Sequence, residues 1–213
     1  MGRYSYLTLD SGDHLSGSRP DRTLLEPDLS YHVLTVGAAL DWRTSPGYST
    51  RGGLQRVSWS EFFTTNDEPF NFHQFEYEGV QLVPLVREQF GLAGRVLTTL
   101  ADAGSGDEVP AILQPTLGGA TTLRGFATRR FTDRNRLLFT GEYRWRPSRA
   151  VDMAIFFDAG KVGARRKDLG ISHMRTDWGI GVRIHAPRFV ILRLDVAKSG
   201  EGWQVVVAEG RVF

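Results

Sequence analysis

The sequence predicts an all-β protein, an antiparallel transmembrane β-barrel of which about ten strands are present. Apolar and polar residues alternate with a period of two in one segment after another, and no helical period of useful length appears. A soluble β-sandwich also alternates, but its apolar face turns inward and its outer face is freely polar. In a membrane barrel the apolar face meets lipid, and the polar face lines a lumen. The composition of the two faces therefore decides between these folds.

The expected strands follow one another along most of the chain. The most regular alternation lies at 34–42, 137–146, 151–162, 175–186 and 189–198. Less regular strands are expected at Tyr4–Leu9, Leu54–Thr65, Phe70–Leu85, Glu88–Ala101 and Trp203–Phe213. Pro84 indicates a strand end or a bulge, because proline cannot donate a ladder hydrogen bond. Two longer loops are expected, at 11–30 and at 102–135.

The polar faces of these segments favour the barrel. They are rich in small residues and in opposite charges, namely Glu142, Arg144, Asp158, Asp177, Arg183, Arg193 and Asp195. Tyr143, Trp145, Trp178 and Trp42 lie near the predicted ends of apolar faces, as in the aromatic girdles of membrane barrels. No run of 18 or more apolar residues is present, so a transmembrane helix is not predicted.

Composition excludes several other classes of protein. Lysine and arginine total 26 against 24 acidic residues, so bulk charge gives no reason to expect nucleic acid as a partner. The absence of cysteine excludes a disulfide scaffold, a thiolate metal site and a cysteine nucleophile. At 213 residues the chain is long enough for one large all-β domain.

Catalytic and metal-binding motifs were not found. The sequence has no Gly-x-Ser-x-Gly elbow, no His-Glu-x-x-His and no phosphate-binding loop. Its five histidines lack the spacing of metal ligands. The acidic glycine-rich loops at 10–13 and 102–107 lack the spacing of a calcium loop. We therefore expect a protein that is not an enzyme, with no catalytic residue, metal or cofactor.

Four short motifs, in order and in spacing, resemble those of BamA/TamA-type outer-membrane barrels, the bacterial surface antigen superfamily. Leu123-Arg124-Gly125-Phe126 resembles the (Val/Leu)-Arg-Gly-(Phe/Tyr) tip of the family's sixth extracellular loop. Phe156-Phe157-Asp158-Ala159-Gly160 resembles its Phe-x-Asp-x-Gly strand, and Glu142-Tyr143-Arg144 resembles the acidic strand after the loop. Asp41-Trp42-Arg43, with Pro46 and Arg51-Gly52, resembles its Asp-x-Arg hairpin. The likeness covers the chain from about Tyr31 onward.

The resemblance implies that residues 1–213 are the C-terminal portion of a sixteen-stranded barrel, with a lumen-inserted loop at about 103–134. Members of this family carry a signal peptide and usually POTRA domains before the barrel, so we expect a fragment rather than a reduced barrel. The resemblance also implies that a terminal strand with Gly210 and Phe213 acts as an assembly signal.

The resemblance further implies that Arg124 pairs with Glu142 and Asp158 inside the lumen. The alternation supports this independently, because it places both carboxylates on the polar face, one strand apart. A buried arginine needs carboxylates to offset its desolvation, and its planar fork can bond two of them. Gly125 and Gly160 would allow the close approach of the backbone.

The function that the resemblance implies is an outer-membrane insertase or translocase of a Gram-negative-type bacterium. Its partners would be outer-membrane lipid, unfolded outer-membrane or secreted β-rich proteins, and accessory periplasmic proteins bound through N-terminal domains. Two alternatives are a soluble all-β ligand-binding module and a barrel that anchors a patatin-like enzyme domain.

Overall fold

Ten strands form one antiparallel sheet in the computed structural model, which describes residues 2–9, 29–45, 47–65, 69–86, 89–148, 150–186, 189–210 and 213. Their order in the sheet is β1-β2-β3-β4-β5-β8-β9-β10-β11-β12, so strands that follow one another lie side by side. The bounds are β1 Gly2–Leu9, β2 Leu29–Asp41, β3 Gly52–Thr64, β4 Phe72–Pro84, β5 Phe90–Ala103, β8 Asn135–Trp145, β9 Val151–Gly163, β10 Arg175–Ala186, β11 Phe189–Ser199 and β12 Gly202–Ala208. The prediction of an all-β fold of about ten antiparallel strands is confirmed.

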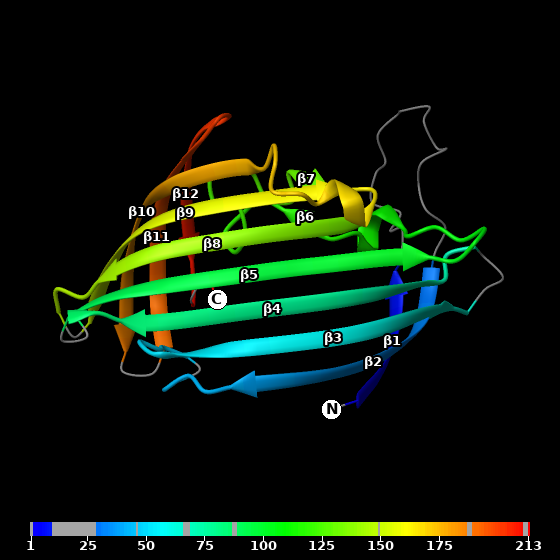
Figure 1. Ribbon diagram of the computed structural model, residues 1–213, viewed down its shortest axis with the longest axis horizontal. Coiled ribbons are helices and arrows are strands. Elements are labelled where there is room, and N and C mark those ends of the chain that lie inside the picture. The colour runs from blue at the N-terminus through cyan, green and yellow to red at the C-terminus, as the bar shows by residue number, and fades with distance from the viewer. Residues whose placement is uncertain are drawn as a thin grey trace, which may run out of the picture.

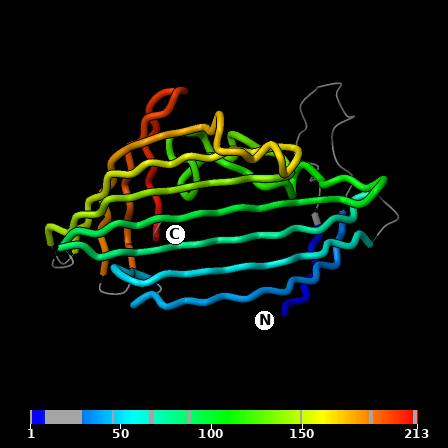
Figure 2. The backbone as a smooth tube through the Cα atoms, in the orientation of Figure 1, coloured from blue at the N-terminus to red at the C-terminus, as the bar shows by residue number. Residues whose placement is uncertain are grey.

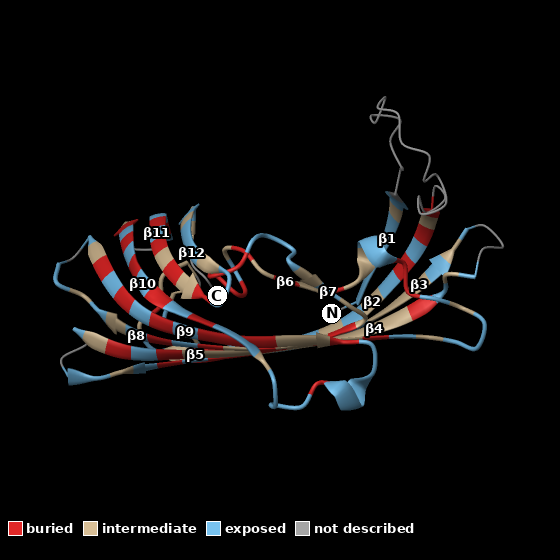
Figure 3. Cartoon of the chain, turned by 90° about the horizontal axis from the view of Figure 1, so that it is seen from above, coloured by how far each residue is buried: buried red, intermediate tan, exposed pale blue. Residues whose placement is uncertain are grey.

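The sheet is strongly curved. Figure 1 shows the long strands running side by side, and the view from above in Figure 3 shows them bent into a trough. Within the described residues, β1 and β12 each pair with one neighbour only and form the two edges of the trough. The chain between β5 and β8 contains the short strands β6 (Thr116–Leu117) and β7 (Phe131–Thr132), which pair with each other on the concave side.

The strands run between two distinct ends, as the tube in Figure 2 shows. Strands β2, β4, β8 and β10 terminate at one end of the sheet, which we call the turn end. The long segment 104–134 and the segment after β9, which holds the 3-10 helix η4 (Arg166–Asp168), lie at the other, which we call the loop end. A second 3-10 helix, η3 (Ala111–Leu113), lies within 104–134. No helix in the described parts of the chain is long and apolar enough to cross a membrane.

The two faces of the sheet differ as the alternation predicts. On β9 the side chains of Ile155 and Phe157 point outward and are 59% and 51% exposed. Phe156 and Asp158, which alternate with them along the strand, point inward and are buried. Charges therefore lie inside and apolar side chains outside, the reverse of a soluble sandwich and the arrangement of a barrel wall.

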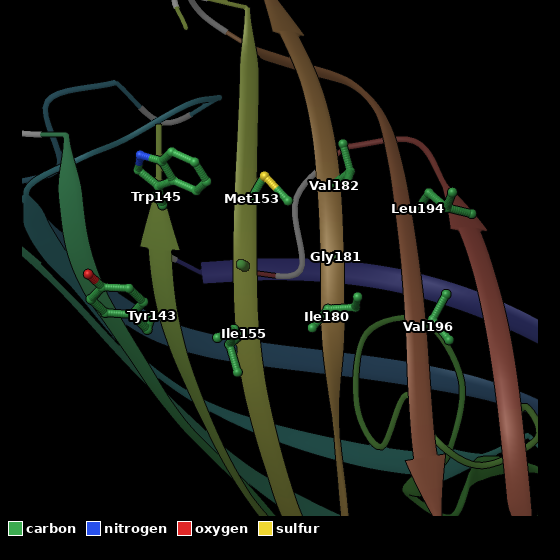
Figure 4. A pocket seen from close by; sticks show the side chains of 10 residues that line it. Tyr143, Trp145, Met153, Ile155, Ile180, Gly181, Val182, Leu194 and Val196 are labelled. Carbon is green, nitrogen blue, oxygen red and sulfur yellow. The ribbon is translucent and has the colours of Figure 1, made fainter. Parts of the chain in front are cut away.

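The outer face also carries an apolar hollow of about 310 Å³ over β8 to β11. Figure 4 shows Ile155, Ile180 and Val182 on neighbouring strands around it. Because its lining is almost wholly apolar and it lies on the face with exposed apolar side chains, it forms part of the surface that a bilayer would cover.

Three apolar clusters fill parts of the concave side. The first lies against β2, β4 and β5 and contains Leu29, Tyr31, Val33, Phe72, Ala101 and Val109. The second joins the inserted segment to the wall through Leu97, Leu117, Leu123, Phe126 and Leu138. The third contains Leu54, Val80, Leu82 and Ala93, with Phe213 packed against it.

The structure locates three of the predicted segment ends. The last strand ends at Ala208, so the strand predicted to run to Phe213 is wrong in its final residues. Gly210 takes a left-handed conformation (φ +74°), which turns the chain out of the strand, and the Phe213 ring packs against the third apolar cluster. By contrast, β4 does end at Pro84, where the missing donor terminates the ladder. The loop predicted at 11–30 lies outside the described residues up to 28, and β2 begins at Leu29.

Candidate functional site

The tip of the inserted segment is a compact turn built around Gly118 and Gly119. Both glycines take left-handed φ values, +113° and +95°. The amide of Gly119 donates to the carbonyls of Leu123 and Phe126, each at 3.1 Å. A side chain at Gly118 would collide with the carbonyl of Ala127. The two glycines therefore allow the chain to close on itself and present Arg124 toward the wall.

Arg124 is fully buried and bonds three carboxylates of the wall. Its Nε and Nη2 donate to the two carboxylate oxygens of Asp158 at 2.8 and 3.0 Å. Its Nη1 donates to Oε1 of Glu142 at 2.8 Å and to Oδ2 of Asp195 at 3.4 Å. All four side chains are 0% exposed. The sequence pointed to Glu142 and Asp158 as partners of Arg124, and the structure brings both to it.

Aromatic packing completes the site. The guanidinium carbon of Arg124 lies 3.4 Å from the centroid of the Phe156 ring. A cation over an aromatic face is attracted by the negative face of the ring, most strongly where water is excluded. Since Phe156 precedes Asp158 by two residues on β9, one face of a single strand supplies both the ring and the bidentate carboxylate.

Three further arginines surround the same carboxylates. Arg183 donates to Oε1 of Glu142 at 2.7 Å, and Arg144 donates to Oε2 at 2.8 Å. Nε of Arg193 lies 3.1 Å from Oδ2 of Asp195, and Nη2 donates to the carbonyl of Ala120 in the inserted segment. We call Arg124, Arg144, Arg183, Arg193, Glu142, Asp158 and Asp195 the lumen network.

The network keeps Arg124 charged. Burial alone would lower the pKa of its guanidinium. The hydrogen bonds that Arg124 donates to Asp158 and the charges of Asp158, Glu142 and Asp195 outweigh burial, and they raise the pKa of Arg124 above its ordinary value. A permanently charged, buried arginine is stable only while its carboxylates remain in place. The arrangement therefore ties the position of the inserted segment to the position of the wall.

Gly125 and Gly160 lie where a side chain would not fit. A Cβ at Gly125 would lie 2.5 Å from Cβ of Asp177 and 3.0 Å from Cβ of Ser199. A Cβ at Gly160 would lie 2.9 Å from Cδ1 of Leu117 in the inserted segment. The first glycine lets the tip approach β10 and β11, and the second lets the segment lie on β9. Phe126, next to Gly125, is buried in the second apolar cluster.

The hairpin motif does not join the network. Asp41 and Arg43 bond each other within the connection from β2 to β3, with Nη2 to Oδ2 at 2.6 Å and Nε to Oδ1 at 2.8 Å. Gly52 has φ +93° and lies against the carbonyl of Trp42, where a side chain would collide. Pro46 lies outside the described residues. Asp41, Arg43 and Gly52 thus shape their own turn.

Gly210 and Phe213 also lie apart from the network. The Phe213 ring lies 5.3 Å from the guanidinium of Arg144 and 5.9 Å from that of Arg95, as centroid distances. Phe213 therefore contacts the concave side at the turn end and does not extend β12. Its role as part of an assembly signal stays a prediction.

Asp195, Arg183 and Arg193 were recognised from sequence only as residues of the polar face. Their position on that face was the available signal, but alternation does not tell which of the lumen-facing charges meet. In the described parts of the chain, no group of three or more His, Asp or Glu residues is arranged to hold a metal ion.

Comparisons with known proteins agree with this geometry. The sequence profile of the Omp85 superfamily domain matches residues 29–204. Among solved structures, the crystal structure of BamA from Haemophilus ducreyi lacking POTRA domains 1–3 has a similar fold, with a TM-score of 0.74 and 16% sequence identity. The match covers 90% of this chain and 44% of that one, so the chain spans less than half the length of this BamA. No curated protein matches the chain in sequence.

Proposed function

The chain belongs to the Omp85 superfamily, and we propose that it forms the wall and the lumen lock of a barrel that assembles or exports β-rich proteins in the bacterial outer membrane. The observation that carries the proposal is Arg124, which is fully buried at the tip of an inserted segment and bonded to Asp158, Glu142 and Asp195. A segment fixed in the lumen by so many ionic bonds suits a wall that must keep its shape while other parts of the barrel rearrange.

The lock would act by fixing the inserted segment to several strands of the wall, so that the segment supports the wall from inside. Removing one partner of a buried ion pair costs about 3–5 kcal/mol, because the remaining charge stays buried without compensation. Arg124 bonds β8, β9 and β11 at the same time, so separating these strands would break its buried ion pairs at that cost. The segment would hold these strands in register during the work of the barrel.

In this proposal an unpaired sheet edge, such as that of β12, is where a substrate would engage. An extended polypeptide can add to a sheet edge through backbone hydrogen bonds, the mode called β-augmentation. An unfolded β-rich protein offers such segments, and outer-membrane lipid would cover the apolar outer face. Accessory periplasmic proteins would bind through domains that precede the barrel in relatives of this family. No catalytic step is needed for this activity.

The outer face weighs against a soluble ligand-binding module. Large apolar side chains such as Ile155, Ile180 and Val205 point outward and are 59%, 59% and 64% exposed. A water-soluble protein rarely exposes apolar rows of this extent. A role as the anchor of a patatin-like enzyme domain has no specific support among the described residues.

The proposal is tested by comparing Arg124→Ala with Arg130→Ala in cells that depend on the protein. Arg130 lies in the same segment, and its ion pair with Glu201 is exposed, with side chains 51% and 44% accessible. We expect Arg124→Ala to lower the amount of folded β-rich protein in the outer membrane, and Arg130→Ala to leave it unchanged. Equal effects of the two changes, or no effect of either, would contradict the proposal.

A further inference from the structure

We propose that residues 42–45 and 47–51, between β2 and β3, form a second closure of the lumen, fastened by Tyr48 to the opposite wall at the turn end. This closure goes beyond the function proposed above, because it uses different residues from the Arg124 lock and enters the lumen from the opposite end. Neither the hairpin motif nor the alternation of the strands pointed to Tyr48.

Tyr48 contacts a distant strand across the concave side of the sheet. Its hydroxyl donates to Oδ2 and Oδ1 of Asp152 at 2.9 and 3.1 Å, across 104 residues of sequence. Asp152 lies on β9, and β4, β5 and β8 separate β9 from β3 in the sheet. Figure 1 shows β2 and β3 low in the view and β9 and β10 high, with the other long strands between them. The contact therefore spans the concave side instead of following the wall.

On the opposite wall, His185 and Asp152 both contact Tyr48. The Tyr48 ring stacks on the His185 ring, with centroids 4.0 Å apart and planes 15° apart. Nε2 of His185 lies 3.2 Å from Oδ1 of Asp152. Asp152 and His185 are 2% and 7% exposed. A ring that stacks on one residue and donates to its neighbour is fixed in both position and orientation.

The environment keeps the Tyr48 hydroxyl protonated. Burial raises its pKa well above the ordinary value, and the charge and hydrogen bond of Asp152 act in the same direction. The guanidinium groups of Arg146 and Arg144 act against this shift and do not reverse it. Tyr48 thus remains a donor to the carboxylate, as the closure requires.

The space around Tyr48 is nearly full. Cavities of about 10 and 20 Å³ remain beside it, against Leu82, Arg144 and Asp152. Phe213 borders the larger one. A volume of this size holds about one water molecule, so Tyr48 packs closely against its neighbours on the opposite wall.

Two arginines, Arg144 and Arg183, connect the Tyr48 closure with the Arg124 lock. Arg144 and Arg183 bond Glu142, the carboxylate that also receives Arg124. The same two arginines line the cavity beside Tyr48. The Tyr48 closure and the Arg124 lock are therefore neighbours in one network while they hold segments from opposite ends of the barrel.

A distance measurement between spin labels tests the closure. Because the chain has no cysteine, Thr44→Cys and Ala150→Cys introduce a unique pair of labels, both at exposed positions. We expect one narrow distance distribution in the parent protein. Tyr48→Phe keeps the ring and removes only the hydroxyl, and it should add a second population at longer distance. Tyr77→Phe is the matched control, since it removes a hydroxyl bonded to Gln55 within one wall, and it should leave the distribution narrow.

A second readout reports solvent access. Val190 is buried and lines the larger cavity, so Val190→Cys in the otherwise cysteine-free protein should react slowly with a water-soluble maleimide. We expect Tyr48→Phe to speed this reaction at least about tenfold, because hydrogen bonds to charged groups contribute that factor or more to an equilibrium. Tyr77→Phe should not change the rate.

The outcomes separate the two closures. An unchanged distance distribution together with an unchanged alkylation rate in Tyr48→Phe would overturn the proposal. The proposal would also be overturned if Arg124→Ala released the hairpin while Tyr48 was intact, because the Arg124 lock would then be what closes the turn end. Release by Tyr48→Phe with the inserted segment still in place supports the second closure even if the proposed function in protein assembly fails.

Discussion

Arg124 of the inserted segment donates two hydrogen bonds to the carboxylate of Asp158 on β9, at 2.8 and 3.0 Å. The two residues are 34 residues apart in sequence, and neither side chain is exposed to solvent. The planar guanidinium and the carboxylate thus meet in the fork-to-fork geometry that makes such pairs strong and directional. Glu142 and Asp195 bond the remaining nitrogen from neighbouring strands.

Arg124→Ala should lower the free energy of unfolding by about 3–5 kcal/mol, since it leaves buried carboxylates without their cation. Arg124→Lys should restore little of this loss, because an ammonium cannot bond Asp158 bidentately and Glu142 at once. Urea unfolding in detergent micelles measures both values. Arg130→Ala is the control, with an expected cost of about 0–1 kcal/mol for an exposed pair. Equal losses in Arg124→Ala and Arg130→Ala would show that burial of the lock contributes nothing.

Gly125→Ala should destabilise the protein by about 1–3 kcal/mol through overpacking. The added methyl group would lie 2.5 Å from Cβ of Asp177, on a backbone strand that cannot easily move. Gly104→Ala, at the start of the same segment, meets its nearest atom at 3.6 Å and should be tolerated. Thermal unfolding of the two variants side by side gives the comparison, and a tolerated Gly125→Ala would mean that the tip lies farther from β10.

Phe156→Leu should weaken the lock, whereas Phe157→Leu should not. The two residues are adjacent on β9, but Phe156 lies under the Arg124 guanidinium, and Phe157 points outward and is 51% exposed. Loss of the cation–π contact is expected to cost about 0.5–2 kcal/mol, beyond the change in packing volume. The unfolding midpoints of the two variants check this, and the opposite order would place the functional face of β9 on the outside.

Asp158→Asn and Asp195→Asn should differ in severity. Asp158 accepts two short hydrogen bonds from Arg124, while Asp195 accepts one at 3.4 Å. We therefore expect Asp158→Asn to lower the unfolding free energy more than Asp195→Asn does. If Asp195→Asn were the more damaging change, its contact with Arg193, at 3.1 Å, would be the stronger contribution.

Stability should also fall at alkaline pH through Tyr48. Its pKa is raised in the folded protein, so above the ordinary tyrosine pKa the unfolded chain has lost this proton while the folded chain keeps it. The stabilising contribution is complete below about pH 10 and declines as pH rises toward the folded value. Unfolding free energies at a series of pH values should show a steeper alkaline loss for the parent protein than for Tyr48→Phe. Parallel curves would mean that Tyr48 is exposed.

The sequence made the wall easier to predict than the contacts across it. Alternation placed Glu142 and Asp158 on the inner face, because side chains point to opposite sides of a strand at every second residue. The family motif then supplied Arg124. Asp195 lies two strands beyond Asp158 in the sheet, and only the curvature of the sheet brings it within reach of the same guanidinium.

Contacts that depend on curvature were missed. Tyr48 lies in a connection without alternation, and its partners Asp152 and His185 are on strands that are distant along the sheet. The prediction that the last strand runs to Phe213 was wrong for a related reason. Strand β12 ends at Ala208, Gly210 turns the chain with a left-handed conformation, and the Phe213 ring packs on the concave side. A one-dimensional pattern carries no information about such packing.

The double-mutant cycle of Arg124→Ala and Asp158→Ala tests the central claim most directly. If the two side chains form a buried lock, each single change deprives the other side chain of its bidentate partner, and the double variant should be no less stable than either single one. The unfolding free energies in micelles should then give a coupling of about 2 kcal/mol or more, near the upper end for residues in contact. Strictly additive losses would contradict the lock.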